Sequence, residues 1–187
     1  MSKKNSSVQN LKILFKNDKK IVDTYQIFKK NLNSLNKNKS FVVGVSGGAD
    51  SLSLCALMKT FSNETKVKVF YVLIDHGIRK NSNKEAKQVR ALLKKKKISL
   101  TIIKNKEKIN KNIQGRAREV RYKLLSIFSK KNNAKYILTA HHSDDQIETF
   151  LIRLSRGSGI QGLSSMKKIT KLNKATSLIR PLLDLKK

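Results

Sequence analysis

Residues 41–45 constrain the fold more than any other stretch, because they form an apolar run rich in β-branched side chains that ends in a glycine turn. Such a run predicts a strand buried on both faces of a sheet. The turn at residues 46–48 follows, and Asp50 then opens an apolar-periodic segment that is typical of a helix. The succession of strand, tight turn and helix N-terminus predicts an α/β protein.

The same segment has the chemistry of an anion site. Glycine lets the backbone approach a phosphate closely, and the N–H groups and dipole of a helix N-terminus attract negative charge. The hydroxyls of Ser46 and Ser51 add donors at the two ends of the loop. The lysine of a P-loop NTPase is missing, so that type of site does not fit. An ordinary glycine turn is the alternative.

Strand and helix patterns alternate along the rest of the chain. Apolar runs predict strands at residues 67–74, 98–103 and 136–140, and helical spacing predicts helices at 82–97, 114–130 and 141–154. This alternation implies right-handed βαβ crossovers. We therefore expect a doubly wound, mostly parallel five-stranded sheet with helices on both faces. Residues 177–180, just before the one proline, are expected to be the fifth strand, at an edge.

Residues 1–39 are expected to form a basic helical extension to a domain that spans residues 40–187. Their apolar residues suggest one or two amphipathic helices that pack against this domain and leave a lysine face in solvent. A transit peptide is the weaker alternative, because lysine dominates instead of arginine. The apolar positions are Val8, Leu11, Leu14, Phe15, Ile21, Val22, Tyr25, Phe28 and Leu32.

The charge balance points to a polyanionic partner. The chain has 42 Lys+Arg against 12 Asp+Glu, a formal net charge of +30. That favours nucleic acid as a partner over small metabolites alone. A general bias toward lysine is the alternative, since lysine and asparagine are abundant throughout. Because aromatic residues make up only 6% of the chain, platforms for base stacking are not evident.

The single cysteine, Cys55, lies in the apolar helix after the loop, so we expect it in the core and exclude a disulfide or a cysteine-based metal site. No run reaches the ~18 apolar residues that a membrane span requires. The N-terminus leads into no apolar signal-peptide segment. We therefore expect a cytoplasmic protein without a membrane partner, and leave a homodimer open.

A second polar cluster follows the strand predicted at 136–140. Because the carboxyl ends of parallel strands meet at one edge, this cluster is expected near the loop. Asp145, Glu148 and Thr149 share a helical face, and Asp144 is adjacent to it. Carboxylates placed there suit Mg²⁺ and a cationic amine. Helix capping by first-turn acids and a zinc site that includes the two neighbouring histidines are the alternatives.

Taken together, these motifs resemble those of the tRNA(Ile)-lysidine synthetase family, within the PP-loop ATP pyrophosphatase superfamily. The loop matches that superfamily's pyrophosphate-binding signature, Ser-Gly-Gly-x-Asp-Ser. Residues 71–79 are similar to a Val-Asp-His-Gly-Leu-Arg strand end, and residues 117–122 to Ala-Arg-x-x-Arg-Tyr. Residues 139–149 are similar to Thr-Ala-His-His-x-Asp-Asp-Gln-x-Glu-Thr, and residues 153–159 and 180–183 complete the set. The resemblance covers roughly residues 40–187.

The resemblance implies that residues 40–187 form a PP-loop ATP-binding catalytic domain. It further implies a reaction in which ATP adenylates the C2 carbonyl oxygen of the wobble cytidine in a CAU-anticodon tRNA(Ile), after which the ε-amine of L-lysine displaces AMP to give lysidine. The ATP-binding residues it implies are Ser46, Gly47, Gly48, Ala49, Asp50, Ser51, His76 and His141. Catalytic roles fall to Asp50, Asp144, Asp145, Arg118 and Arg121, lysine or tRNA contacts to Asp145, Glu148, Arg118 and Arg153, and Mg²⁺ binding to Asp50 and Asp145.

Two other functions stay open. One is a different PP-loop tRNA-modifying enzyme such as a cytidine thiolase, although a single cysteine disfavours the paired Cys-x-x-Cys motifs of those enzymes. The other is a non-catalytic RNA-binding remnant. Members of the resembled family usually continue into C-terminal tRNA-binding domains, which residues 1–187 do not contain.

Overall fold

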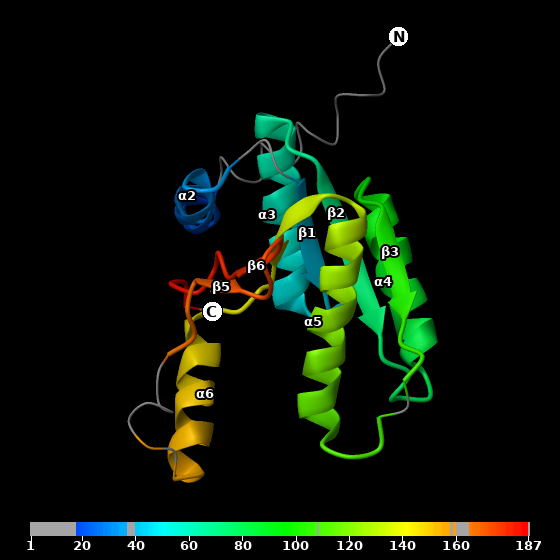
Figure 1. Ribbon diagram of the computed structural model, residues 1–187. Helices are drawn as coiled ribbons and strands as arrows, with labels where there is room; N and C mark the ends of the chain where they lie inside the picture. The colour runs from blue at the N-terminus through cyan, green and yellow to red at the C-terminus, as the bar shows by residue number, and fades with distance from the viewer. Residues whose placement is uncertain (1–17, 37–39, 108, 158, 160–164, 187) are drawn as a thin grey trace.

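The computed structural model describes residues 18–36, 40–107, 109–157, 159 and 165–186. In this part of the chain a six-stranded sheet is flanked by helices (Figure 1). The elements in order are α2 (Lys19–Asn33), β1 (Ser40–Val45), α3 (Ala49–Thr65), β2 (Val69–Asp75), α4 (Ser82–Lys95), β3 (Leu100–Lys104), α5 (Ile113–Lys131), β4 (Ala134–Leu138), α6 (Ser143–Ser155), β5 (Ile169–Lys171) and β6 (Ser177–Ile179).

Strand β1 holds a central place in the sheet, whose strand order is β3-β2-β1-β4-β6-β5. It pairs in parallel with β2 and with β4, so that Val43 lies opposite Tyr71 on one side and Leu138 on the other. The chain winds outward from β1 through β2 to β3, and then returns to β4 on the opposite side of β1. The carboxyl end of β1 is therefore a topological switch point, the usual place for a ligand in such a sheet.

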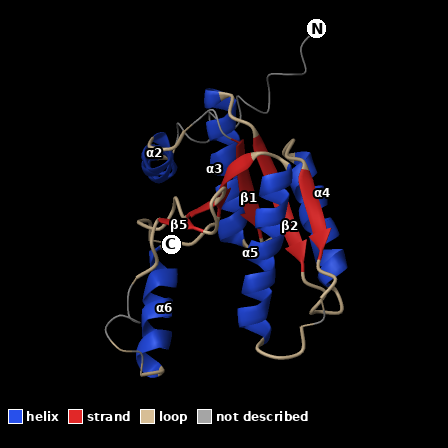
Figure 2. Cartoon of the chain, in the orientation of Figure 1, coloured by secondary structure: helices blue, strands red, loops and turns tan. Residues whose placement is uncertain are grey.

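The sheet is buried on both faces because alternate β1 side chains enter two different cores. Phe41, Val43 and Val45 belong to the larger cluster, which includes residues of α2, α3 and α4. Val42 belongs to a smaller cluster on the other face, with Leu125 of α5. Figure 2 shows α5 crossing the sheet, with α3 and α4 on its other side. The predicted α/β class with helices on both faces is confirmed.

The predicted number of strands was wrong. The segment at 177–180 does form a strand, β6, but it is not at an edge, because β5 pairs with it in antiparallel orientation. With three residues, β5 is too short to give an apolar run of its own. The turn that joins β5 and β6 fixes it instead, since Leu172 and Asn173 donate backbone N–H groups to the carbonyl of Thr176.

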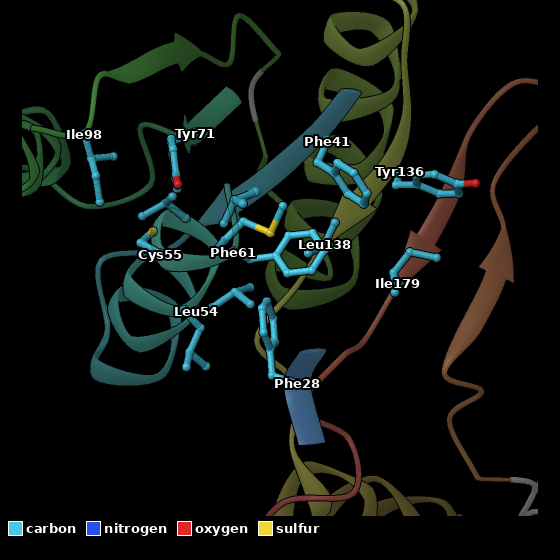
Figure 3. Packing of buried hydrophobic residues seen from close by; sticks show 14 of the residues in the cluster. Phe28, Phe41, Leu54, Cys55, Phe61, Tyr71, Ile98, Tyr136, Leu138 and Ile179 are labelled. Atoms are coloured by element: carbon cyan, nitrogen blue, oxygen red, sulfur yellow. The ribbon is translucent and has the colours of Figure 1, made fainter. Parts of the chain in front are cut away.

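Helix α2 is part of the main core, as its apolar spacing predicted. Its N-cap Asp18 accepts hydrogen bonds from the N–H groups of Lys20 and Ile21. Its buried face carries Phe28, whose ring meets that of Phe61 in α3 edge-on at a centroid distance of 6.2 Å (Figure 3). The predicted apolar positions before residue 18 lie outside the described residues, and the boundary at residues 39/40 stays a prediction.

Helix α6 differs from the other helices because it buries none of its side chains. It projects away from the sheet in Figure 1. Its N-terminus is nevertheless fixed, since the carbonyl of Leu185 accepts hydrogen bonds from both the backbone N–H and the hydroxyl of Ser143, each at 2.9 Å. Among the described helices, none combines the length and the hydropathy that crossing a bilayer would require.

Replacing the buried ring of α2 tests whether this helix is integral to the fold. Phe28→Ala is expected to lower the free energy of unfolding by about 3–5 kcal/mol, the usual cost of emptying a buried phenylalanine site. Ile27→Ala is the matched control, because Ile27 is 39% exposed on the same helix. Urea unfolding of both variants measures the difference. Equal, small losses would mean that α2 is only loosely attached.

Candidate functional site

The loop after β1 is closed by a hydroxyl. Ser51, almost fully buried in the first turn of α3, accepts the N–H groups of Ser46 at 3.3 Å and Gly47 at 3.1 Å and donates to the carbonyl of Gly48 at 2.9 Å. In this structure its hydroxyl therefore organises the loop itself. The first turn of α3 still presents N–H groups that have no carbonyl partner within the helix, which is the requirement for binding an anion.

Only glycine fits at the apex of this loop. Gly47 has a φ of 90°, a conformation that L side chains rarely adopt. A Cβ atom built on it would lie 2.8 Å from a methyl group of Val89 in α4. The loop is thus pressed against α4, and the glycine that the sequence pattern singled out is required both for its backbone angle and for this contact.

Two carboxylates from different elements converge beside the loop. Asp50 comes from the first turn of α3 and Asp145 from the first turn of α6, and each has an oxygen 3.6 Å from Nε2 of His142. The His142 side chain is only 14% exposed and lies between them. The structure thus brings together the two acids that the sequence analysis assigned to Mg²⁺ binding.

Asp145 also stabilises its own helix. One of its carboxylate oxygens accepts the backbone N–H of His142 at 2.7 Å, a hydrogen bond that caps the N-terminus of α6. The capping role that the sequence left open is therefore present. It does not exclude a second role, because Asp145 is one-third exposed and also lines a cavity next to the loop.

The loop and the two helices enclose a small cavity of about 180 Å³. A larger one of about 700 Å³ adjoins it, between the ends of β1 and β2, α4 and the start of α5. Arg121 and Ser46 line both cavities. The small cavity is also lined by Gly48, Asp50, Ser51, His141 and Asp145. The larger cavity is also lined by His76, Arg79, Glu85, Gln114 and Arg118.

His76 stands at the larger cavity with unmet hydrogen-bonding groups. The turn that carries it is fixed by Asp75, whose carboxylate accepts the N–H of Gly77 at 3.0 Å. Both ring nitrogens of His76 are buried, and neither has a hydrogen-bond partner among the described residues. Burial, reinforced by Arg121, lowers the pKa of His76 against the opposing effect of Asp75. A neutral imidazole there has one donor and one acceptor for a ligand.

His141 is held in a neutral state at the small cavity. Its Nδ1 lies 2.9 Å from the hydroxyl of Thr139. Burial, and then the charges of Arg118 and Arg180, lower the pKa of His141 to about 4, against the opposing effect of Asp145. At neutral pH this imidazole therefore carries no charge beside the phosphate loop.

Arg180 lines neither cavity, but it is a charged neighbour of His141 that sequence reasoning did not assign. It is only 6% exposed, and its Nη1 donates to the carbonyl of Lys167 at 2.6 Å and to the hydroxyl of Thr170 at 3.0 Å. Burial and the charge of Arg118 lower its pKa. In the sequence, Arg180 stands out because it precedes the one proline. No pattern there predicted that its charge would act together with that of Arg118 in α5.

The guanidinium group of Arg118 interacts electrostatically with those of both Arg121 and Arg180. The charge of Arg118 lowers the pKa of both Arg121 and Arg180, after the larger effect of burial. The described residues contain no ion pair between any of the three and a carboxylate. Arg118 is supported by the ring of Tyr122, at 5.3 Å from its centroid. Clustered cations without acidic partners are typical of an anion site.

The remaining residues that the sequence analysis assigned to the site line neither cavity. Asp144 is 3.9 Å from Nδ1 of His142 and accepts from Ser143. Glu148 is exposed further along α6, and Arg153 lies beyond it. Their roles stay predictions. Gly47 and Ala49 belong to the loop without lining either cavity.

The donor set suits magnesium better than zinc. Within the described part of the chain, no three side chains from His, Cys, Asp and Glu converge to hold a metal ion. Mg²⁺ is usually bound through one or two carboxylates together with substrate phosphates and water. Asp50 and Asp145, on the two sides of one imidazole beside the loop, fit that description.

A phosphate loop at the switch point of a parallel sheet, next to a cavity of nucleotide size, defines a nucleotide-binding α/β protein. The comparison with protein families agrees. The PP-loop domain matches residues 18–187, and the chain belongs to this family. Membership implies that the protein uses ATP.

Curated relatives narrow the class. A tRNA(Ile)-lysidine synthase of Wolbachia pipientis wMel is 47% identical over 150 residues, which cover 79% of this chain and 35% of the relative. One of Orientia tsutsugamushi is 36% identical over 152 residues, covering 81% and 34%. The chain spans about a third of the length of these relatives.

Solved structures support the fold alone. The U34-tRNA thiolase NcsA from Methanococcus maripaludis superposes with a TM-score of 0.73 at 19% identity, over 89% of this chain and 60% of the thiolase. An FMN adenylyltransferase of Candida glabrata gives a TM-score of 0.52 at 15% identity, over 98% and 56%.

Removing one charge separates the two roles of Asp145. Asp145→Asn keeps the shape and a capping oxygen, so stability should change by less than ~1 kcal/mol. If the carboxylate acts on substrate, ATP-dependent turnover should fall by at least ~100-fold. Melting temperature and product formation are measured on the same preparation. Nearly unchanged turnover would reduce Asp145 to a capping residue.

The charge of Arg180 is expected to act on His141. Arg180→Met removes one of the cations that disfavour the imidazolium, so the pKa of His141 should rise, by up to about one unit. NMR titration of the histidine ring measures it. A merely structural Arg180 would lower the melting temperature and leave the histidine pKa where it was.

Proposed function

We propose that this chain activates the wobble cytidine of a CAU-anticodon tRNA(Ile) with ATP and joins L-lysine to it, giving lysidine, AMP and pyrophosphate. The observation that carries this proposal is the pair Asp50 and Asp145 beside the phosphate loop. Two carboxylates would repel a polyphosphate at this position unless a cation lay between them. The reaction supplies two such cations, Mg²⁺ and the lysine ammonium.

In the first step, the C2 carbonyl oxygen of cytidine attacks the α-phosphorus of ATP, and the bond to the β-phosphate breaks. The loop at residues 46–51 holds the departing pyrophosphate through backbone N–H groups and the N-terminus of α3. Arg118 and Arg121 stabilise the negative charge that develops at the α-phosphate. Mg²⁺ bound by Asp50 and Asp145 would supply further charge neutralisation.

The ATP base and ribose are assigned to the larger cavity. Its volume of about 700 Å³ lies within the range usual for small-molecule sites. His76 offers a donor and an acceptor to this part of the nucleotide. His141 offers a ring nitrogen on the pyrophosphate side. Because its imidazole is uncharged, it does not repel the Mg²⁺ or the lysine ammonium.

In the second step, the ε-amine of lysine attacks C2, the bond from C2 to the adenylate oxygen breaks, and AMP leaves. The ammonium must lose a proton before attack and the new C–N bond requires the loss of another. We assign to the carboxylate of Asp145 the tasks of holding the ammonium and accepting its first proton, and the second proton passes to solvent water. Glu148, one turn further along α6, and Arg153 would contact the lysine or the RNA.

The thiolase alternative is disfavoured by the chain's one cysteine. Cys55 is completely buried, and burial raises the pKa of its thiol to about 12. A buried, protonated thiol binds no cluster. Because the proposed substrate is tRNA, we retain the cytoplasm as the expected location. A homodimer stays an open prediction.

The decisive measurement is pyrophosphate release from ATP, with and without L-lysine, in the presence of tRNA(Ile) carrying a CAU anticodon. We expect release that depends on this tRNA, and lysine incorporation into it. The same tRNA with a GAU anticodon is the substrate control. A non-catalytic RNA-binding remnant would bind the tRNA and release nothing.

Asp50→Ala is expected to abolish release while leaving the fold intact, because it removes a partly exposed carboxylate instead of a core group. Asp23→Ala, an exposed acid on α2, is the matched control and should keep wild-type turnover. Near-normal activity of Asp50→Ala would remove Asp50 from the catalytic residues.

A further inference from the structure

Helix α4 contributes to two separate hollows. The larger nucleotide cavity is lined by its first half, including Glu85, Ala86 and Val89. A different hollow of about 350 Å³ lies between the end of α4 and the start of β3. We call it the α4 groove, and its lining residues are Arg90, Lys94, Lys97, Ile98, Ser99 and Leu100.

The α4 groove is basic and uncompensated. Arg90, Lys94 and Lys97 are exposed, and none of them forms an ion pair with a carboxylate of the described residues. Helix α4 contains a single acid, Glu85, and its nearest cation is Arg79, at 3.8 Å. The charged residues that line the groove are therefore all cations.

The arrangement of these cations is not explained by helix capping. Cations in the last turn of a helix stabilise its negative end, which accounts for Lys94 and Lys95. Arg90 lies one turn earlier, on the same face as Lys94. Lys97 follows the helix with a φ of 57° and still lines the same hollow. Three cations from a helix and the turn after it thus face one space.

We propose that the α4 groove binds the phosphate backbone of the RNA whose target nucleotide enters the catalytic cavities. This rests on the proposed function for the identity of the RNA. From its first residue to its last, α4 runs about 20 Å, so the groove would contact nucleotides remote from the reacting base. Arginine and lysine are the side chains that bind phosphate oxygens most strongly.

The position of β3 supports a backbone ligand. It is an edge strand of the described sheet, paired only with β2. The outer side of an edge strand presents backbone N–H groups, which can donate hydrogen bonds to phosphate oxygens. A contact of this kind fixes the register of the RNA without reading its sequence.

The test compares two triple variants that lose the same charge. Arg90→Gln/Lys94→Gln/Lys97→Gln empties the groove of cations. The control variant removes three exposed cations from α2, which lies at the opposite flank of the molecule in Figure 1. It is Lys19→Gln/Lys20→Gln/Lys30→Gln. Affinity for CAU-anticodon tRNA(Ile) is measured by fluorescence anisotropy over a range of salt concentrations.

The groove variant should bind tRNA about 10–100-fold more weakly near 100 mM salt, with the slope of log affinity against log salt reduced by about two to three. The α2 variant should stay within about threefold of wild type. Arg90→Gln alone should reduce the slope by about one and covers the case in which the triple variant does not fold. Melting temperatures verify folding.

Equal losses in the two triple variants would overturn the proposal, since only the overall field would then matter. An unchanged slope in the groove variant would overturn it too. A groove-dependent slope in a protein that incorporates no lysine would leave the groove standing and refute the proposed function. A wild-type chain that binds no tRNA would refute both.

Discussion

The parallel pairing of β1 with both β2 and β4 is the constraint on which the rest of the structure depends. It brings three carboxyl ends to one edge, so that the phosphate loop, the turn with His76 and the N-terminus of α6 meet there. Residues almost 100 positions apart, such as Asp50 and Asp145, approach the same imidazole as a result. The close contact of Gly47 with Val89 then presses the loop against α4.

Charge of opposite sign is separated within this small volume. The acids lie where α3 and α6 begin, and the charges of Arg118, Arg180 and Arg121 act on His141, which lines the same small cavity as the acids. Neither group neutralises the other by direct pairing among the described residues. Such a site is prepared for a ligand that carries both charges, as a polyphosphate with its cation does.

Periodicity predicted the buried strands and the helices between them, because each is long enough to show its own pattern. The positions of Asp50, Asp145 and the loop at one edge of the sheet were predictable for the same reason, because they follow closely on such strands. Three features were not predictable in this way. Strand β5 has only three residues, Ser51 turned out to organise the loop, and the place of Arg180 depends on hydrogen bonds to residues 167 and 170. Each is fixed by tertiary contacts that no local pattern records.

The hydrogen bonds from Ser143 to Leu185 have a consequence for synthesis on the ribosome. Strand β6 joins β4 from late in the chain, and residues 182–185 hold the beginning of α6. The phosphate loop and its glycines are translated long before that. In a nascent chain the contacts that hold the start of α6, the helix that carries Asp145, therefore become available only after residue 185 has left the exit tunnel. Until then the N-terminus of α6 lacks the two hydrogen bonds that fix it.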